Sequence, residues 1–224
     1  MSLEDQVQVN SRNREPRQPL VLLVDVSESM KNDIGDVQSG LEGLQHELQN
    51  DPVARNRVEL AVITFGGTVQ LLGGFEEAAG WVRPNLTAQG GTPMSAAIDK
   101  ALDLVESKKL LYRQHGLEFF RPWIFLVTDG APTDEALWPG AVARVTEAEK
   151  KERVALFSVG TESADFNRLR QISPARDPIR LKSGEWRKMF IWLSRSVSAK
   201  SKSKPQETVP LVDPMAPNGW AVAP

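Results

Sequence analysis

Five small oxygen-bearing side chains follow apolar runs or precede a helical pattern in three separate parts of the sequence. They are Asp25, Ser27, Ser29, Thr92 and Asp129. Any one of them alone could cap a helix or stabilise a turn. Together they provide two carboxylates and three hydroxyls, all of which are hard oxygen ligands of the kind that Mg²⁺ and Mn²⁺ bind. The set therefore predicts a divalent-cation site.

The spacing of the first three residues suits a single centre. In Asp-x-Ser-x-Ser leaving a strand, alternate side chains point the same way, so Asp25, Ser27 and Ser29 can converge while Val26 turns back to the core. With only two carboxylates in the predicted set, the charge of the ion is not over-neutralised. We therefore expect it to remain electrophilic toward a carboxylate that a partner supplies.

The second predicted loop, Gly90-Gly91-Thr92-Pro93, is suited to close approach. Glycines at 90 and 91 let the chain pass near the ion without a Cβ clash, and Pro93 is pre-set for a first helical turn. This arrangement directs Thr92 at the predicted site.

Apolar patterning predicts the elements that hold these loops. Nearly continuous apolar runs at 20–24, 123–127 and 154–159 are typical of strands buried on both faces of a parallel sheet. The run 58–65, followed by two glycines and 68–72, predicts a hairpin with an antiparallel edge strand. A short strand is expected at 178–181, confined by Pro178 to an edge or a strand start.

Apolar residues at helical spacing predict helices over about 34–49, 93–107, 134–151 and 185–197. Alternating strands and helices predict an α/β, doubly wound, mostly parallel sheet of Rossmann-like type, with one antiparallel edge strand and helices on both faces. Ligands of such folds bind beyond the carboxyl ends of the strands, where the strand order reverses. We expect a flexible segment at 1–18, one domain at 19–198, and a Pro/Ser/Lys-rich tail outside the core at 199–224. The apolar residues Leu211, Val212, Met215 and Trp220 can still dock this tail along the domain or along a partner.

Composition excludes several function classes. The chain has 224 residues, a net charge of −2, no cysteine and two histidines, so it has no global field for nucleic acid or anionic lipid, no thiolate chemistry and no histidine metal cage. The N-terminus lacks the apolar stretch of a secretory signal, and apolar runs of about five residues are far below the ~20 that span a bilayer. These features predict a cytoplasmic location.

The constellation Asp25-x-Ser27-x-Ser29 with Thr92 and Asp129-Gly130 resembles the metal-ion-dependent adhesion site (MIDAS) of von Willebrand factor A (vWA) domains. The resemblance extends over residues 20–197. It implies one bound Mg²⁺ or Mn²⁺ and a role in protein binding rather than catalysis. It also implies ligation by Ser27, Ser29 and Thr92 through their hydroxyls and by Asp25 and Asp129 directly or through water.

The segments QGGTPMSAAID, LVTDGAPTD and FIWLSRSVS resemble those of the bacterial tellurite-resistance-associated, TerY-like vWA proteins. This narrower resemblance implies a cytoplasmic protein of a chemical-stress response. It also implies association with a protein kinase and a PP2C-type phosphatase.

The alternative function is that of a metal-dependent phosphohydrolase or a phosphoacceptor signalling domain, both of which place an Asp at a strand end in a Rossmann-like fold. The former needs a second carboxylate where this chain has Ser27, and neither a P-loop nor a G-x-G-x-x-G motif follows the first strand. We expect His46 and His115 to be solvated. Trp81 and Trp186 are expected to pack, and Trp138 either packs or anchors an interface near the predicted metal edge.

Overall fold

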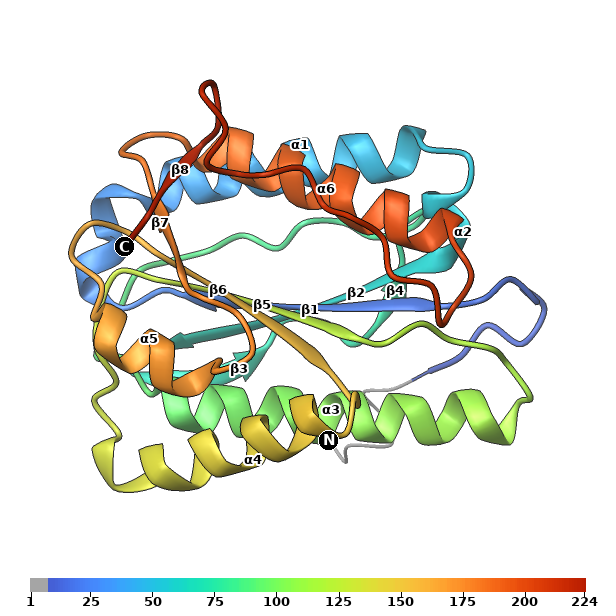
Figure 1. Ribbon diagram of the computed structural model, residues 1–224, viewed down its shortest axis with the longest axis horizontal. Helices are drawn as coiled ribbons and strands as arrows, with labels where there is room; N and C mark the ends of the chain where they lie inside the picture. Colours follow the sequence, from blue (N-terminus) through green and yellow to red (C-terminus); the bar gives the residue numbers. More distant parts are fainter. Residues whose placement is uncertain (1–7) are drawn as a thin grey trace.

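The computed structural model describes residues 8–224, which form an eight-stranded sheet between two layers of helices (Figure 1). The strands are β1 (Gln18–Asp25), β2 (Val58–Gly66), β3 (Thr68–Leu71), β4 (Glu76–Glu77), β5 (Trp123–Thr128), β6 (Ala155–Gly160), β7 (Ile179–Leu181) and β8 (Ala221–Val222). The α-helices are α1 (Ile34–Asn50), α2 (Ala54–Arg57), α3 (Met94–Gln114), α4 (Trp138–Lys150), α5 (Phe166–Ile172) and α6 (Trp186–Lys202). Two short 3₁₀ helices are η2 (Glu28–Asn32) and η3 (Glu135–Leu137).

The sheet has the strand order β3-β2-β1-β5-β6-β7-β8, with β4 also paired to β2. Strands β1, β2, β5, β6 and β7 are parallel, and β3 runs antiparallel at one edge. The predicted doubly wound, mostly parallel fold is therefore confirmed. Because the chain moves from β1 to β2 on one side and later to β5 on the other, the order reverses at β1. The carboxyl end of β1 is thus the place where such folds bind ligands.

Two cores flank the sheet, and β1 contributes to both. Leu20, Leu22 and Val24 pack into the layer that contains α1 and α6, whereas Val21 and Leu23 pack into the layer that contains α3, α4 and α5 (Figure 1). All eight residues of β1 are buried. This explains the continuous apolar run, because a strand covered on both faces has no polar alternation.

The structure extends or adds elements where periodicity is weak. Helix α3 reaches Gln114 and α6 reaches Lys202, beyond the predicted ends at about 107 and 197. Helix α5 was not predicted, since its seven residues give fewer than two helical turns and little periodic signal. Its start is fixed by the Asp165 carboxylate, which accepts hydrogen bonds from the backbone N–H groups of Asn167 and Arg168 at 3.0 and 3.1 Å.

The structure differs from the expectation of a flexible segment over 1–18 in the part that it describes. Residues 1–7 lie outside the described residues. Arg17 is fully buried; its guanidinium donates to the carbonyls of Asn10 and Asn13 at 3.0 and 2.7 Å and forms an ion pair with buried Glu59 at 3.1 Å. The buried guanidinium therefore ties residues 10–17 to the start of β2.

The tail at 199–224 docks on the domain, one of the two sites considered for it, and the expectation that it lies outside the core is wrong for its end. After α6 the chain turns back along that helix and adds β8 antiparallel to β7 (Figure 1). Trp220 and Ala221 are buried in the core that contains α1 and α6, and the Trp220 ring packs edge-on against Trp192 with ring centroids 5.4 Å apart. Strand β8 covers the edge that β7 was expected to leave open.

The tryptophan and histidine side chains considered in the sequence differ in burial as follows from their positions in the two cores and on the surface. Trp81 and Trp186 are buried, and both histidines are exposed, as expected. Trp138 is 2% exposed and donates a hydrogen bond to Gln171 at 2.9 Å, so it packs between α4 and α5 and does not anchor an interface. No helix among residues 8–224 is long and apolar enough to cross a membrane.

Candidate metal centre

The candidate site lies at the carboxyl ends of β1 and β5, where the strand order reverses. Three loops meet there: the one that follows β1, the one that follows β5, and the one that leads into α3. Asp25, Ser27, Thr92 and Asp129 are buried, whereas Ser29 is exposed. Ser29 is therefore the predicted ligand most accessible to solvent.

The Asp25 carboxylate is fixed at the end of β1 by donors from two strands. It accepts a hydrogen bond from the Ser27 backbone N–H at 2.8 Å and one from the Thr128 hydroxyl at 2.5 Å. The first bond folds the chain into a turn directly after the strand, and the second holds β1 to the adjacent end of β5. Asp25 is thus preorganised, with its side chain completely shielded from bulk water.

A chain of oxygen atoms joins the first and third loops. The Ser27 and Ser29 hydroxyl oxygens are 3.1 Å apart, and the Ser29 hydroxyl donates to Asp129 Oδ1 at 2.9 Å. The two hydroxyls therefore lie together as predicted, but not by strand alternation: β1 ends at Asp25, and the turn into η2, which contains Ser29, brings them together. Asp129, which is 100 residues away from Ser29 in the chain, meets them because β1 and β5 are neighbours.

Thr92 approaches the same place from the loop before α3. Its hydroxyl faces Gly130, at which an added Cβ would lie 3.8 Å from Thr92 Oγ1. Among residues 8–224, no hydrogen bond joins this hydroxyl to the other four side chains. The structure thus links four of the predicted residues directly by sequence adjacency or hydrogen bonds and places Thr92 beside them.

The glycines of this loop serve close backbone approach, although the near neighbour differs from the one expected. Gly90 has φ +64°, and a Cβ there would lie 2.6 Å from the Gly67 Cα, so the β2–β3 turn rather than an ion requires glycine. The Glu28 N–H donates to the Gly90 carbonyl at 2.9 Å. Backbone bonds therefore fix the loop that carries Thr92 to the loop that carries the two serines.

Three residues without an assigned role in the sequence prediction hold the loops together. Thr128 fixes Asp25, as described. The Thr133 hydroxyl accepts from the Thr92 N–H at 3.0 Å, and its own N–H donates to the Thr92 carbonyl at 2.9 Å. Asp134 accepts from the N–H groups of Ser95 and Ala96 at 3.1 and 2.8 Å and thereby caps α3. The acidic and hydroxyl residues of the segment TDGAPTD (128–134) are the sequence feature from which these roles could have been predicted.

The electrostatics of the site disfavour two free carboxylates. Burial raises the pKa of Asp25, an effect that hydrogen bonds from Ser27 and Thr128 partly offset, and the charge of Asp129 raises it further. Burial likewise raises the pKa of Asp129, against the hydrogen bond from Ser29. No Lys, Arg or His in the described part of the chain forms an ion pair with either carboxylate. The negative charge of the two carboxylates thus has no counter-ion among residues 8–224.

The donor set fits a small divalent cation. In an octahedral shell with oxygens at about 2.1 Å, neighbouring oxygens are about 3.0 Å apart. The Ser27–Ser29 and Ser29–Asp129 oxygen separations of 3.1 and 2.9 Å agree with that edge. Residues 8–224 contain no cluster of three or more His, Cys, Asp or Glu side chains able to hold a metal. A site here therefore depends on hydroxyls and water as much as on carboxylates.

The chain belongs to the von Willebrand factor type A domain family. The family model matches residues 20–187, which is about three quarters of the chain. Domains of this fold are known for metal-dependent adhesion and protein interaction, and they are generally interaction modules. A search of curated protein sequences finds no significant match.

Solved structures agree on the fold. The pilus adhesin SpaC of Lactobacillus rhamnosus GG has a TM-score of 0.67 and 16% identity, over 87% of this chain and 31% of the adhesin. Manganese-loaded TRAP protein of Plasmodium vivax has a TM-score of 0.51 and 21% identity, over 78% and 73% of the two chains. Proximal thread matrix protein 1 of the mussel byssus, with a zinc-occupied MIDAS motif, has a TM-score of 0.54 and 16% identity, over 82% of this chain and 48% of the byssus protein. The chain spans about a third of the adhesin's length.

Proposed function

We propose that this protein binds a partner protein through a divalent cation, Mg²⁺ or Mn²⁺, held by Asp25, Ser27, Ser29, Thr92 and Asp129. When bound, the cation supplies a positive centre that accepts a carboxylate from an Asp or Glu of the partner. Asp25 and Asp129 supply the negative charge, and the three hydroxyls supply neutral oxygens. The observation that carries the proposal is the pair of buried, unpaired carboxylates within a chain of oxygens at metal-shell spacing.

The residues around the site support binding rather than chemistry. Thr128, Thr133 and Asp134 hold the three loops by hydrogen bonds, so the oxygen ligands need little rearrangement. Both histidines are exposed and lie outside the site, and the position two residues after Asp25 carries a hydroxyl rather than a second acid. We therefore propose a non-enzymatic adaptor. The manganese of the TRAP protein and the zinc in the MIDAS motif of the byssus protein belong to those proteins and support a metal here by analogy of fold.

For the partners, we propose a protein kinase and a PP2C-type phosphatase in a bacterial, cytoplasmic response to tellurite or related chemical stress. Support comes from the resemblance of QGGTPMSAAID, LVTDGAPTD and FIWLSRSVS to TerY-like proteins. Isolating the tagged protein from cells with Mg²⁺ or with EDTA is the experiment that tests the proposal. The kinase and phosphatase should be retained with Mg²⁺ and lost with EDTA; retention in EDTA would contradict metal-dependent binding.

Thr92→Ala is expected to weaken partner binding about tenfold, equivalent to about 1.4 kcal/mol, without unfolding the protein. The change removes one hydroxyl ligand, whereas the backbone bonds between Thr92 and Thr133 remain. Partner affinity in Mg²⁺ and the midpoint of thermal unfolding are the two measurements.

Thr87→Ala is the matched control, because Thr87 is exposed in the segment that leads to the same loop. Both variants should unfold near the wild-type temperature. An unchanged partner affinity for Thr92→Ala, together with an affinity that EDTA does not alter, would contradict the proposed contact.

A further inference from the structure

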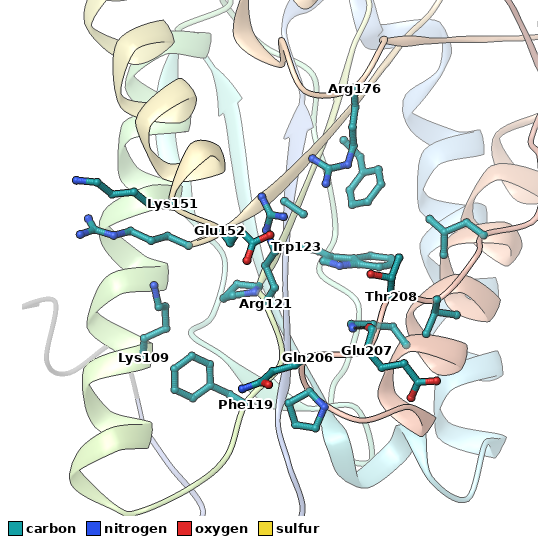
Figure 2. Close-up of a pocket in the computed structure, with 18 of the residues that line it drawn as sticks. Lys109, Phe119, Arg121, Trp123, Lys151, Glu152, Arg176, Gln206, Glu207 and Thr208 are labelled. Carbon is teal, nitrogen blue, oxygen red and sulfur yellow. Dashed lines mark hydrogen bonds between the residues drawn. The ribbon is translucent and has the colours of Figure 1, made fainter.

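A cavity of about 570 Å³ opens at the amino ends of β5 and β6, the opposite end of the sheet from the candidate metal centre. Its volume is in the usual range of small-molecule sites, about 300–1,000 Å³. It lies between the α3–β5 and α4–β6 connections on one side and the tail at 205–211 on the other (Figure 2). Six residue steps, from Trp123 to Asp129, separate it from the metal centre by about 20 Å along β5.

The cavity concentrates positive charge in a chain whose net charge is −2. Seven basic and two acidic side chains line it. Three of the basic side chains, Lys109, Lys151 and Arg176, have carboxylate partners in Glu106, Glu147 and Glu149. The positive charge is therefore local and is built by residues from several distant parts of the sequence.

The other four basic side chains have no carboxylate partner among residues 8–224. They are Arg113, Arg121, Arg153 and Lys200. Arg121 donates only to the carbonyls of Val154 and Glu149, at 2.6 and 3.0 Å. Lys200 is 9% exposed, and its ammonium donates to the Glu207 carbonyl. An ammonium so nearly buried without a counter-ion is costly, and an anion in the cavity offsets that cost.

The pKa directions agree with incompletely compensated charge. Burial lowers the pKa of Arg121, the neighbouring Arg176 lowers it further, and the charges of Glu149 and Glu152 offset these effects only in part. Burial also lowers the pKa of Lys200, against the charge of Glu207. In both groups the nearby carboxylates offset only part of the cost of burying the cation.

Aromatic rings form part of the cavity wall. Phe119 and Trp123 line it near Lys109 and Arg121, and Gln206 and Thr208 face them from the tail (Figure 2). Flat apolar surface beside guanidinium groups suits a ligand that carries both a planar ring and oxyanions.

We propose that this cavity binds a small ligand with several phosphate groups, of the nucleoside polyphosphate or inorganic polyphosphate class. Guanidinium groups hydrogen-bond phosphate oxygens in pairs, and four unpaired cations from separate segments favour a chain of phosphates over a single anion. The tail at 205–211 encloses one side, which favours a small molecule over an extended acidic protein segment. This inference is independent of the proposed metal-dependent function.

Titration of the full chain with ATP and with inorganic tripolyphosphate tests the proposal. The titrations are done in EDTA, because a metal-bound phosphate at the candidate metal centre would otherwise contribute. Arg113→Gln combined with Arg153→Gln is the first variant, since both side chains are exposed and neither makes a structural hydrogen bond. We expect at least about tenfold weaker binding of whichever polyphosphate binds wild type.

Arg55→Gln combined with Arg187→Gln is the control, because it removes the same charge from exposed positions outside the cavity and should bind like wild type. Lys200→Met is the second variant; it keeps the apolar stem, and its binding should fall to a similar extent. Tighter binding of ATP than of tripolyphosphate would assign a role to the rings, and equal binding would assign recognition to the phosphates alone. Binding of neither compound, equal loss in the control, or preferential binding of a polyglutamate peptide would overturn the proposal.

Discussion

Asp25→Asn is expected to weaken Mn²⁺ binding at least about a hundredfold, or about 2.7 kcal/mol, and to stabilise the metal-free protein. Asp25 is fully buried, and its oxygens already accept bonds from the Ser27 N–H and the Thr128 hydroxyl. Asparagine keeps the shape of the side chain but removes half of the negative charge of the site. Calorimetric titration with Mn²⁺ measures the first effect, and chemical unfolding in EDTA measures the second.

The opposite signs follow from the raised pKa of Asp25. Because burial raises this pKa, the fold penalises the ionised form of Asp25. A neutral side chain removes the penalty, whereas a bound cation compensates for it only in the native aspartate. A variant that lost metal binding and stability together would indicate a damaged fold rather than a removed ligand.

Asp36→Asn is the matched control, since Asp36 is exposed in the first turn of α1 and loses the same charge. Its Mn²⁺ affinity and its stability in EDTA should stay close to wild type. Asp25→Ala combined with Asp129→Ala should abolish Mn²⁺ binding, and binding that survives this double change would place the metal elsewhere.

Acidification should act on metal affinity and on metal-free stability in opposite directions. The pKa values of Asp25 and Asp129 are raised in the folded state above their ordinary value. Their contribution to the free energy of unfolding is therefore more favourable below the unfolded pKa and is lost as the pH rises through the folded pKa. Over the same interval Mn²⁺ affinity falls as the pH is lowered, because the carboxylates must be deprotonated to bind metal. In the Asp25→Asn variant, the free energy of unfolding of the metal-free protein should change less with pH than it does in wild type.

Trp220→Ala is expected to lower the free energy of unfolding by about 3–5 kcal/mol, the usual cost of removing a large buried aromatic side chain. Trp220 is 3% exposed, packs against Trp192, and belongs to the core that contains α1 and α6. The Lys182 N–H donates to the Trp220 carbonyl at 3.0 Å, and this backbone bond is retained in the variant. Urea unfolding monitored by far-ultraviolet circular dichroism measures the loss.

Val212→Ala provides the comparison within the same tail. The Val212 side chain is 71% exposed, and only its carbonyl is used, as an acceptor from Trp192 at 2.7 Å. The free energy of unfolding of the Val212→Ala variant should differ from that of wild type by less than about 0.5 kcal/mol. If both variants were equally stable, the tail would contribute nothing to the core. Removal of residues 204–224, which include β8, should destabilise the domain in the same way as Trp220→Ala.

The sequence was most informative where burial is symmetric and elements are long. Strands covered on both faces show continuous apolar runs, and α1 shows an apolar stripe over 17 residues. Short elements were missed because α5 and β8 have too few residues for a period to appear. The role of Arg17 was missed for a different reason: its partner Glu59 lies far along the chain, and the segment that carries Arg17 is polar. Trp220 is among the apolar residues expected to dock, but its packing against Trp192 within the core was not predicted.

By itself the sequence determined the fold class and the five candidate ligands, because residue type and spacing decide both strand burial and which side chains leave a strand together. Only the tertiary structure decided how the ligands meet. The pairing of β1 with β5 brings Asp129 to Ser29, and bonds from Thr128 and Thr133 fix the loops. It also placed the tail across the far end of the sheet and enclosed the basic cavity there. Such contacts join residues about 100 positions apart, as Ser29 and Asp129 are, and no local pattern encodes them.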